Sequence, residues 1–352
     1  MFARARLLRV GRQLATASVA VSTAAAAAAT LPSGGSQCEP ARSLSQIRAK
    51  DFKLLDHYHG KARVRVLRVH HDGPRHSVRE YSVQTRLFSP DYDKVFTEMK
   101  NDGLVATDTQ KNTVYVVAKR SESRTLEGFG VDVARHMMRE YPMLSAVEVE
   151  IQEDLWDRAI TPDGEPHEHG FVKRGPERST ARVRLTREEP DAPEVVSGFT
   201  GLTVLKTTKS GFSNFLRDKY TLLPETEERC LATEMQVEWR YTCGRSAKQP
   251  PPAPDYAAVR AGVRDELLKA FYGPAEGGVF SVSLQATIYD AGCLVLAAMP
   301  RVASISIFTP NIHMIPFTPL AQLGGQKAQP FEDDVFVATS DPAGTIHCTV
   351  SR

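Results

Sequence analysis

Hydrophobic and polar residues alternate over several short stretches of this chain, which is the pattern of half-buried β-strands. Val64, Val66 and Val69 lie among arginines, and the stretch Tyr81–Leu87 alternates again after a Gly73–Pro74 turn. These two stretches predict an antiparallel hairpin. Similar patterns predict further strands at residues 113–119, 147–151, 183–185, 202–205, 235–241 and 282–288, and a final strand at 303–308.

Helical spacing appears in two longer stretches. Apolar residues recur three and four positions apart over residues 126–141, which predicts a helix that Pro142 ends. The same spacing over residues 256–270 predicts a second helix before Gly273–Pro274, and a short helix is predicted at 291–299. Strands, a helix and further strands therefore occur twice. This order predicts an α+β chain of two similar halves with antiparallel sheets.

The N-terminal 50 residues differ from the rest in charge. Residues 1–38 hold four arginines and no Asp or Glu, although the whole chain of 352 residues is nearly neutral, with 44 Lys and Arg against 42 Asp and Glu. Spread arginines followed by the run Ala24–Ala29 are typical of an organelle transit peptide. A secretory signal and a tail without an address are the alternatives. We predict no nucleic-acid partner, because the total charge is balanced, and no membrane span, because no apolar stretch reaches about 20 residues.

Histidines supply the candidates for a metal site. His57–His59, His70–His71 and His167–His169 are close pairs, and His-x-His on a strand would place both rings on one face. The third pair falls in a predicted loop after Pro162–Gly164, and no matching third ligand is found. Solvated histidines are the favoured interpretation, so we predict no metal. No GxGxxG motif is present either, which argues against a dinucleotide site.

Three polar segments are candidates for binding or catalysis. Residues 105–113 are most simply a turn that enters a strand, or alternatively a loop that offers hydroxyls and backbone N–H groups. Residues 206–215 combine polar side chains with phenylalanines, which fits either a strand end with core aromatics or a binding loop. Residues 309–313 follow an apolar strand, where a single histidine usually has a structural role.

Taken together, these segments resemble the urate oxidase (uricase) family. Thr203–Phe212, followed by Phe215–Asp218, Tyr220, Leu223 and Arg229, is similar to the signature of that family. Val105–Asp108 with Lys111–Thr113 resembles a second motif. Further blocks match in the same order, namely Gly60–Lys61, Leu284–Tyr289, Pro310–His313, Ser340–Pro342 and Cys348–Val350. The resemblance extends over roughly residues 52–350.

The resemblance implies a fold and a reaction. The fold would be two tandem tunnelling-fold (T-fold) units, in which antiparallel sheets carry helices on one face, assembled into a barrel-like homotetramer. We assign residues 1–50 to the extension, 51–187 to the first unit and 188–352 to the second. The reaction would be oxidation of urate by O₂ to 5-hydroxyisourate with release of H₂O₂, without metal or organic cofactor, at sites shared between subunits.

The resemblance also implies which residues bind urate, a flat anion. Arg229 would be one arm of a clamp, since a guanidinium forms two parallel charge-assisted hydrogen bonds. Gln285 would be the other arm, because an amide both donates and accepts. Phe212 would stack on the purine face. The backbone N–H groups of Asp108 and Leu284 would bind the remaining rim atoms; the family often has Val at the second position.

A proton relay is implied as well. Lys61, Thr107 and His313 would move protons so that urate becomes more electron-rich and gives electrons to O₂ more readily. A lysine acts as a base only where desolvation or a nearby positive charge lowers its pKa. Asn311 and Thr107 would hold O₂, and later peroxide or water, over the ring.

Two other functions remain open from the sequence. A zinc-dependent T-fold enzyme acting on a pterin or GTP would need His and Cys ligands on strands, which we do not find. A non-catalytic purine-binding homologue need not keep Lys61, Thr107 and His313 together. The family resemblance implies the peroxisome, but the chain ends Val350–Arg352 without a Ser-Lys-Leu-type signal, and the N-terminus indicates a mitochondrion or another organelle instead.

Overall fold

The computed structural model of the protein describes residues 52–242, 253–317 and 334–352. The chain divides after Phe52, and the unit Lys53–Arg352 holds the helices and strands described below. The predicted extension, residues 1–50, and the loop Pro250–Pro252 lie outside the described residues. A nine-stranded antiparallel sheet forms the centre of this unit, and its strands lie side by side in chain order from β1 to β8, with β9 paired to β7.

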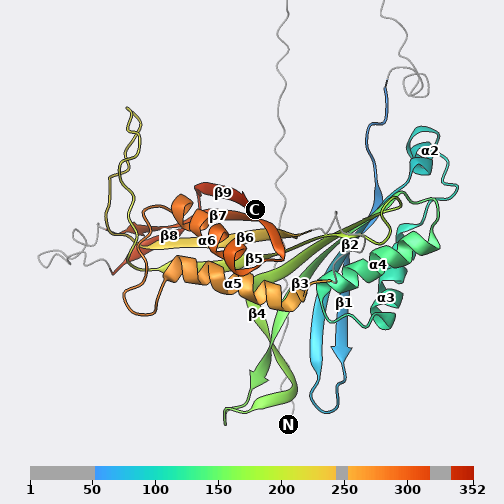
Figure 1. Ribbon diagram of the computed structural model, residues 1–352, viewed down its shortest axis with the longest axis horizontal. Coiled ribbons are helices and arrows are strands. Elements are labelled where there is room, and N and C mark those ends of the chain that lie inside the picture. Colours follow the sequence, from blue (N-terminus) through green and yellow to red (C-terminus); the bar gives the residue numbers. More distant parts are fainter. Residues whose placement is uncertain (1–51, 243–252, 318–333) are drawn as a thin grey trace, which may run out of the picture. The chain divides into compact units, whose positions relative to one another are not determined.

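The elements fall into two similar series (Figure 1). The first contains β1 (His59–His70), β2 (Ser77–Phe88), η1 (Pro90–Tyr92), α2 (Asp93–Thr97), α3 (Thr107–Arg120), α4 (Leu126–Glu140), β3 (Ala146–Ile160) and β4 (Pro166–Thr186). The second contains β5 (Glu194–Lys206), β6 (Leu231–Tyr241), α5 (Tyr256–Tyr272), α6 (Leu284–Ala298), β7 (Val302–Pro316), β8 (Phe336–Thr339) and β9 (Thr345–Ser351). Each series thus runs from two strands through two long helices to further strands, and β4 pairs with β5 to join them.

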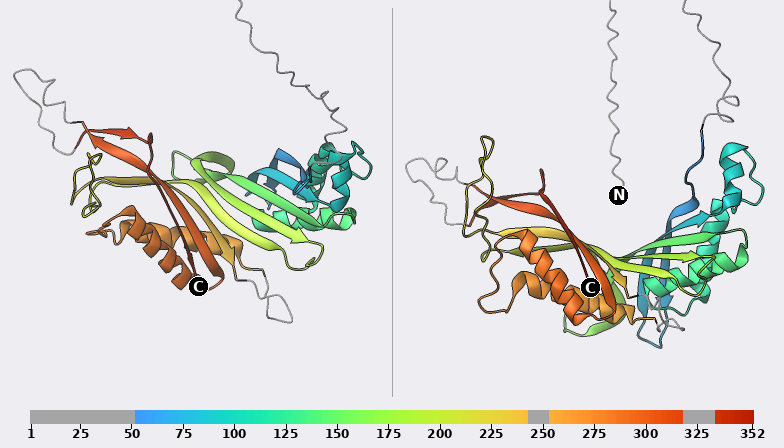
Figure 2. Two further views of the ribbon diagram at one scale, coloured as in Figure 1. Left: turned by 90° about the horizontal axis from the view of Figure 1, so that it is seen from above. Right: turned by 45° about the horizontal axis from the view of Figure 1, so that its top comes forward.

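The long helices cover one face of the sheet, which confirms the predicted fold class (Figure 2). Helix α4 packs on β3 and β4, and α6 packs on β7 and β9. On the strands beneath, buried and partly exposed residues alternate, as in Tyr81, Val83 and Leu87 of β2. Two hydrophobic cores result, one around Phe129 and the other around Trp239. No helix within the described ranges is long and apolar enough to cross a membrane.

Two predicted strands are helices. The prediction of a strand at 113–119 is wrong, because these residues belong to α3; their β-branched residues favour a strand, but Gln110, Val114, Val117 and Ala118 are buried at helical spacing. The prediction at 282–288 is also wrong, since α6 begins at Leu284 and includes most of the short helix predicted at 291–299. The apolar residues at 282–288 fit both the two-residue period of a strand and the 3.6-residue period of a helix. Ser283 caps the helix by accepting a hydrogen bond from the backbone N–H of Ala286 (3.1 Å).

Two smaller predictions also fail. His167–His169 lies in strand β4 and not in a loop, because β3 and β4 extend beyond the neighbouring strands as a long hairpin. The strand predicted at 303–308 is β7, but it is not the last, since β8 and β9 follow and both pair with it.

Candidate active site

Lys61 lies on the edge strand β1, and an irregularity in that strand sets its direction. In the register with β2, Lys61 is opposite Thr85 and Val64 is opposite Val83, so β1 has one extra residue between them. Arg63, within this bulge, has a positive φ of 56°. Cross-strand partners share a face, so the bulge places Lys61 and Val64 on the same, helix-covered side of the sheet. In a regular strand they would face opposite sides.

Thr107 and Asp108 begin helix α3, next to Lys61. The Asp108 carboxylate accepts from Lys111 Nζ (2.5 Å) and Asn112 Nδ2 (2.8 Å). The pKa of Asp108 is lowered, chiefly by the bond from Lys111, and the charge of Lys61 contributes in the same direction. Helix α3 packs on β1, the strand that carries Lys61. The first N–H groups of a helix have no carbonyl partner within it. The structure therefore brings Lys61 together with the free backbone donors of Thr107 and Asp108.

Phe212 and Arg229 meet on two irregular segments beyond β5. Phe212 exchanges both backbone hydrogen bonds with Thr226 (2.7 and 3.0 Å), and the Arg229 N–H donates to the Ser210 carbonyl (2.9 Å). These bonds place the Arg229 guanidinium 5.3 Å from the centre of the Phe212 ring, and Phe215 stacks on the same ring at 5.0 Å. A cation and an aromatic surface thus lie side by side.

Arg229 has no carboxylate partner among the residues that the structure describes. Among the described residues no Asp or Glu oxygen lies within ion-pair distance of it, and its only side-chain hydrogen bond is a long one to Ser210 Oγ (3.4 Å). Burial lowers its pKa, because the desolvated charge is not compensated by an acid. An arginine remains protonated even so. A half-buried cation of this kind can bind an anionic ligand without first breaking an internal ion pair.

The start of helix α6 lies against the Phe212 segment. Ser281 accepts from the Gly211 N–H (3.0 Å) and donates its own N–H to the Lys209 carbonyl (2.9 Å). Two and three residues later come Ser283, the N-cap, and Leu284, the first residue of the helix; Gln285 follows and is exposed. The structure therefore brings Gln285 and the backbone of Leu284 to the same region as Phe212 and Arg229.

Lys206 fixes this region, a role that the sequence did not reveal. Its ammonium group donates to the carbonyls of Phe271 (3.2 Å) and Val279 (2.9 Å) and to Ser281 Oγ (2.7 Å). Burial lowers its pKa. Three donors of one lysine thus tie the end of β5 to the segment that leads into α6. Its position at the end of an apolar strand was the available signal, but its three acceptors belong to residues more than 60 positions away.

Asn311 and His313 lie on β7 at the same end of the sheet as Arg229. Ala232 of β6 is opposite Ile312 of β7. Arg229, just before β6, and His313 therefore lie at nearly the same height along these two strands. The Asn311 N–H donates to the Gly344 carbonyl (2.9 Å), whereas its Oδ1 atom is buried and has no hydrogen-bond partner within the described ranges. His313 pairs with Thr339 of β8. A buried amide oxygen without a partner leaves a polar position open for a small molecule.

Comparison with known proteins decides the family. The Uricase family model matches residues 57–184 and 195–347. The chain belongs to the uricase family. It is 42% identical to a uricase of Arabidopsis thaliana over 302 residues, covering 85% of this chain and 96% of that protein, and 32% identical to a uricase of Oryctolagus cuniculus over 304 residues, covering 86% and 96%. A crystal structure of the uricase from Arthrobacter globiformis matches with a TM-score of 0.73 at 34% identity, covering 86% of this chain and 94% of that one.

Within one chain of this uricase family member the predicted site residues form two groups. The first, on β1 and α3, contains Lys61, Thr107 and Asp108; the second, at the ends of β5 to β7 and α6, contains Phe212, Arg229, Leu284, Gln285, Asn311 and His313. Strands β2 to β5 separate β1 from β6. At a spacing of about 4.8 Å, five steps between strands amount to roughly 24 Å along the sheet. One chain does not bring the two groups together.

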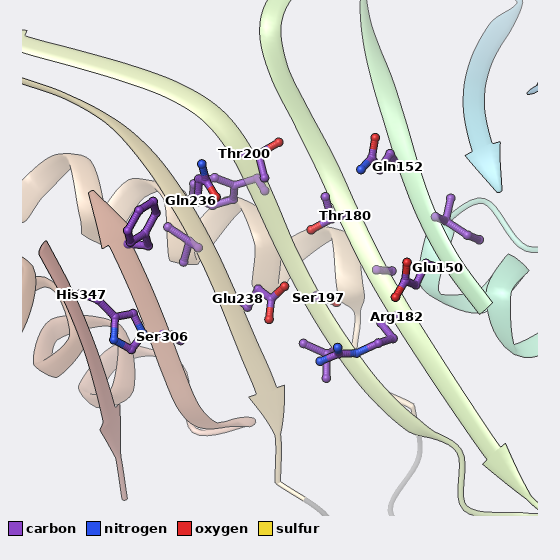
Figure 3. Close-up of a pocket in the computed structure, with 16 residues that line it drawn as sticks. Glu150, Gln152, Thr180, Arg182, Ser197, Thr200, Gln236, Glu238, Ser306 and His347 are labelled. Carbon is purple, nitrogen blue, oxygen red and sulfur yellow. Dashed lines mark hydrogen bonds between the residues drawn. The ribbon is translucent and has the colours of Figure 1, made fainter. Parts of the chain in front are cut away.

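A hollow on the sheet face opposite the helices lies apart from both groups. Its volume is about 460 Å³, and its lining includes Glu150, Arg182, Gln236, Ser306 and His347, but none of the predicted site residues. Figure 3 shows these polar side chains rising from neighbouring strands. They are the outward-facing members of the alternating strands, so the hollow is the exposed face of the sheet and not an extension of the predicted site.

Of the histidine candidates, His71 and the pair His167–His169 lie close together, with His76 between them, whereas His57 and His59 pack against Phe96 and Tyr92. The rings of His71 and His76 are 4.4 Å apart, and those of His167 and His169 are 4.6 Å apart. The His76 N–H donates to the Glu168 carbonyl (3.0 Å), which ties the two hairpins together. Throughout the described part of the chain, no group of three or more His, Cys, Asp or Glu side chains is placed to hold a metal ion.

Proposed function

We propose that this uricase family member oxidises urate. Urate, O₂ and water would give 5-hydroxyisourate and H₂O₂, so that the purine gains one oxygen atom and O₂ takes up two electrons and two protons. The observation that carries the proposal is Arg229, a half-buried cation that has no acid partner in the described part of the chain and lies beside Phe212, at the same end of the sheet as Gln285. That combination suits a flat anion with donors and acceptors around its rim.

The binding roles follow from the chemistry of each group. Arg229 would hold the anionic edge through two parallel hydrogen bonds, and Gln285 would bind the opposite edge through its amide. Phe212 would stack on the ring and fix its plane. The backbone N–H groups of Asp108 and Leu284 each belong to the first turn of a helix, where such donors are unpaired. The partial positive charge of both helix ends would favour the anion.

The proton relay would consist of Lys61, Thr107 and His313. Lys61 and Thr107 are neighbours in the first group, and the hydroxyl can accept a proton on one side and donate one on the other. His313 would complete the relay and exchange protons with solvent. Asn311, two positions before His313, would hold O₂ through its side chain. Its Oδ1, which has no hydrogen-bond partner within the described residues, could accept a hydrogen bond from the peroxide or water that later occupies this position.

A second subunit would complete each site. The separation of the two groups within one chain supports this, because catalytic groups must lie within hydrogen-bond reach of the substrate, about 3 Å. We propose a homotetramer in which Lys61, Thr107 and Asp108 of one chain face Phe212, Arg229 and Gln285 of another. The repeated series of elements supports T-fold units at 51–187 and 188–352, with residues 1–50 as a separate extension.

One assay tests the reaction and its alternatives. The protein is treated with EDTA, urate is added, and the loss of urate absorbance, the uptake of O₂ and the formation of H₂O₂ are followed together. Equal rates of all three, unaffected by EDTA, are expected. Activity that EDTA abolishes and zinc restores would support a zinc-dependent T-fold enzyme instead. Tight urate binding without turnover would support a purine-binding protein.

A further inference from the structure

A chain of buried polar groups lies behind the start of helix α3. Thr85 Oγ1 donates to Gln110 Oε1 (2.8 Å), and Gln110 Nε2 donates to the Val105 carbonyl (3.1 Å). Both side chains are fully buried, in a core otherwise formed by residues such as Val114 and Val117. Gln110 therefore uses its amide on both sides, and neither bond is shared with solvent.

These hydrogen-bonded groups connect the two backbone segments that carry Lys61 and Thr107 of the proposed relay. Thr85 is the cross-strand partner of Lys61, and Val105 precedes Thr107 by two residues. The N-cap of α3, Ala106, has no side chain that could cap the helix. The position of the first turn is therefore fixed from inside the core, through Gln110, and not by the usual cap.

Two further side chains lie at the same backbone segment. His59, on β1 two residues before Lys61, packs edge-on against Tyr92 (6.2 Å between ring centres), burial lowers the pKa of its ring, and its Nε2 atom has no hydrogen-bond partner within the described residues. The Val105 N–H donates to the Tyr92 hydroxyl at the long distance of 3.4 Å. The N–H and the carbonyl of Val105 thus both have buried side-chain partners, and Gln110 is the partner that also bonds to Thr85 on β2, the strand paired with β1.

We propose that Gln110 is a positioning residue for the urate oxidation described above: through Thr85 and Val105 it sets the distance between Lys61 and Thr107. The inference rests on the proposed relay. A buried amide gains little net stability, because the loss of hydration offsets its hydrogen bonds, whereas an apolar side chain would fill the same space at no such cost. What the amide supplies is direction, since its two bonds fix the loop relative to the strand.

The test compares three variants with the wild type in turnover, melting temperature and hydrogen exchange. Gln110→Leu removes both bonds. Thr85→Val combined with Gln110→Leu also removes the hydroxyl that the first variant leaves unpaired, so its stability should return toward that of the wild type. Val114→Ala is the matched control, because it weakens the packing of the same helix one turn further on without removing a side-chain hydrogen bond.

We expect Gln110→Leu to lower kcat by about 10- to 100-fold, since small displacements of reacting groups have effects of this size. The double variant should regain part of the lost melting temperature, since only the Val105 carbonyl stays unpaired, but it should not regain kcat. Val114→Ala should keep kcat within about twofold of the wild type at temperatures where it stays folded. The backbone N–H of residue 110, which donates to the Ala106 carbonyl (3.1 Å) at the start of α3, should exchange faster in Gln110→Leu than in Val114→Ala.

Two results would overturn the inference: kcat of Gln110→Leu equal to that of Val114→Ala, or kcat that recovers together with the melting temperature in the double variant. Either would mean that Gln110 acts only on stability. Failure of the wild type to oxidise urate would refute the proposed function itself. In that event hydrogen exchange still decides whether Gln110 fixes the segment 105–109, and equal exchange in both single variants would refute it.

Discussion

The separation of the two groups of site residues leads to a quantitative test with mixed subunits. Lys61→Met removes the proposed base, and Arg229→Gln removes the cation of the clamp. Each variant alone is expected to be nearly inactive, because every site needs both residues. If Lys61 and Arg229 of one site come from different chains, an oligomer that contains both variants regains some sites in which both residues are intact.

The expected recovery follows from counting. In a random equal mixture, half of the sites receive an intact Lys61 and, independently, half receive an intact Arg229, so about a quarter of all sites are complete. If instead one chain supplied both residues, every chain would carry one defect and recovery would be about zero. The structure favours the first case, because roughly 24 Å of sheet separates β1 from β6 within a chain.

The assay requires co-expression of the two variants with different tags and purification through both, so that only mixed oligomers are measured. Initial rates of O₂ uptake with urate are compared with those of wild-type protein carrying the same tags. A doubly defective chain, mixed with itself, is the negative control. Activity of the mixed oligomers no higher than the sum of the two single variants would refute the assignment of one site to two chains.

Three further predictions concern single positions. Lys61→Met or Thr107→Ala should slow turnover by about 10²- to 10⁴-fold while urate binding, measured by calorimetry, stays largely intact; near-normal turnover would exclude the relay. Gly60→Ala should lower the denaturation midpoint and the activity, because an added Cβ would lie 2.2 Å from the Thr85 carbonyl oxygen, whereas Gly175→Ala, with no atom within 4 Å, should change neither. For Asp154, burial raises the carboxyl pKa, but hydrogen bonds from Lys173, Arg65 and Arg178 together lower it well below 3.8. Its charged form therefore stabilises the fold above pH of about 4, and this contribution is lost as the pH falls toward the lowered pKa. Urea denaturation should show Asp154→Asn clearly less stable than the wild type at pH 6 and progressively closer to it toward pH 2; a constant difference would contradict the assignment.

Local patterns predicted those elements in which one period dominated. The hairpin β1–β2 and the helices α4 and α5 were predicted because their buried residues are almost all apolar and follow a single period. Helix α3 was not, because its inward-facing positions include the polar Gln110 and its β-branched residues favour a strand. Packing against β1 overrides that preference. The start of α6 fitted the strand period and the helix period equally well, and only its packing on β7 and β9 selects the helix.

The sequence by itself determined the family and the types of chemical group available, because ordered motifs such as Thr203–Phe212 and Pro310–His313 are local and can be read without a fold. It could not show how these groups are distributed in space. The bulge that turns Lys61 toward Thr107, the isolated charge of Arg229 and the buried path through Gln110 all depend on partners distant in the chain. Strand order, which only the tertiary structure decides, places the two groups at separate positions along one sheet, and this separation is the basis of the proposal that a second chain completes each site.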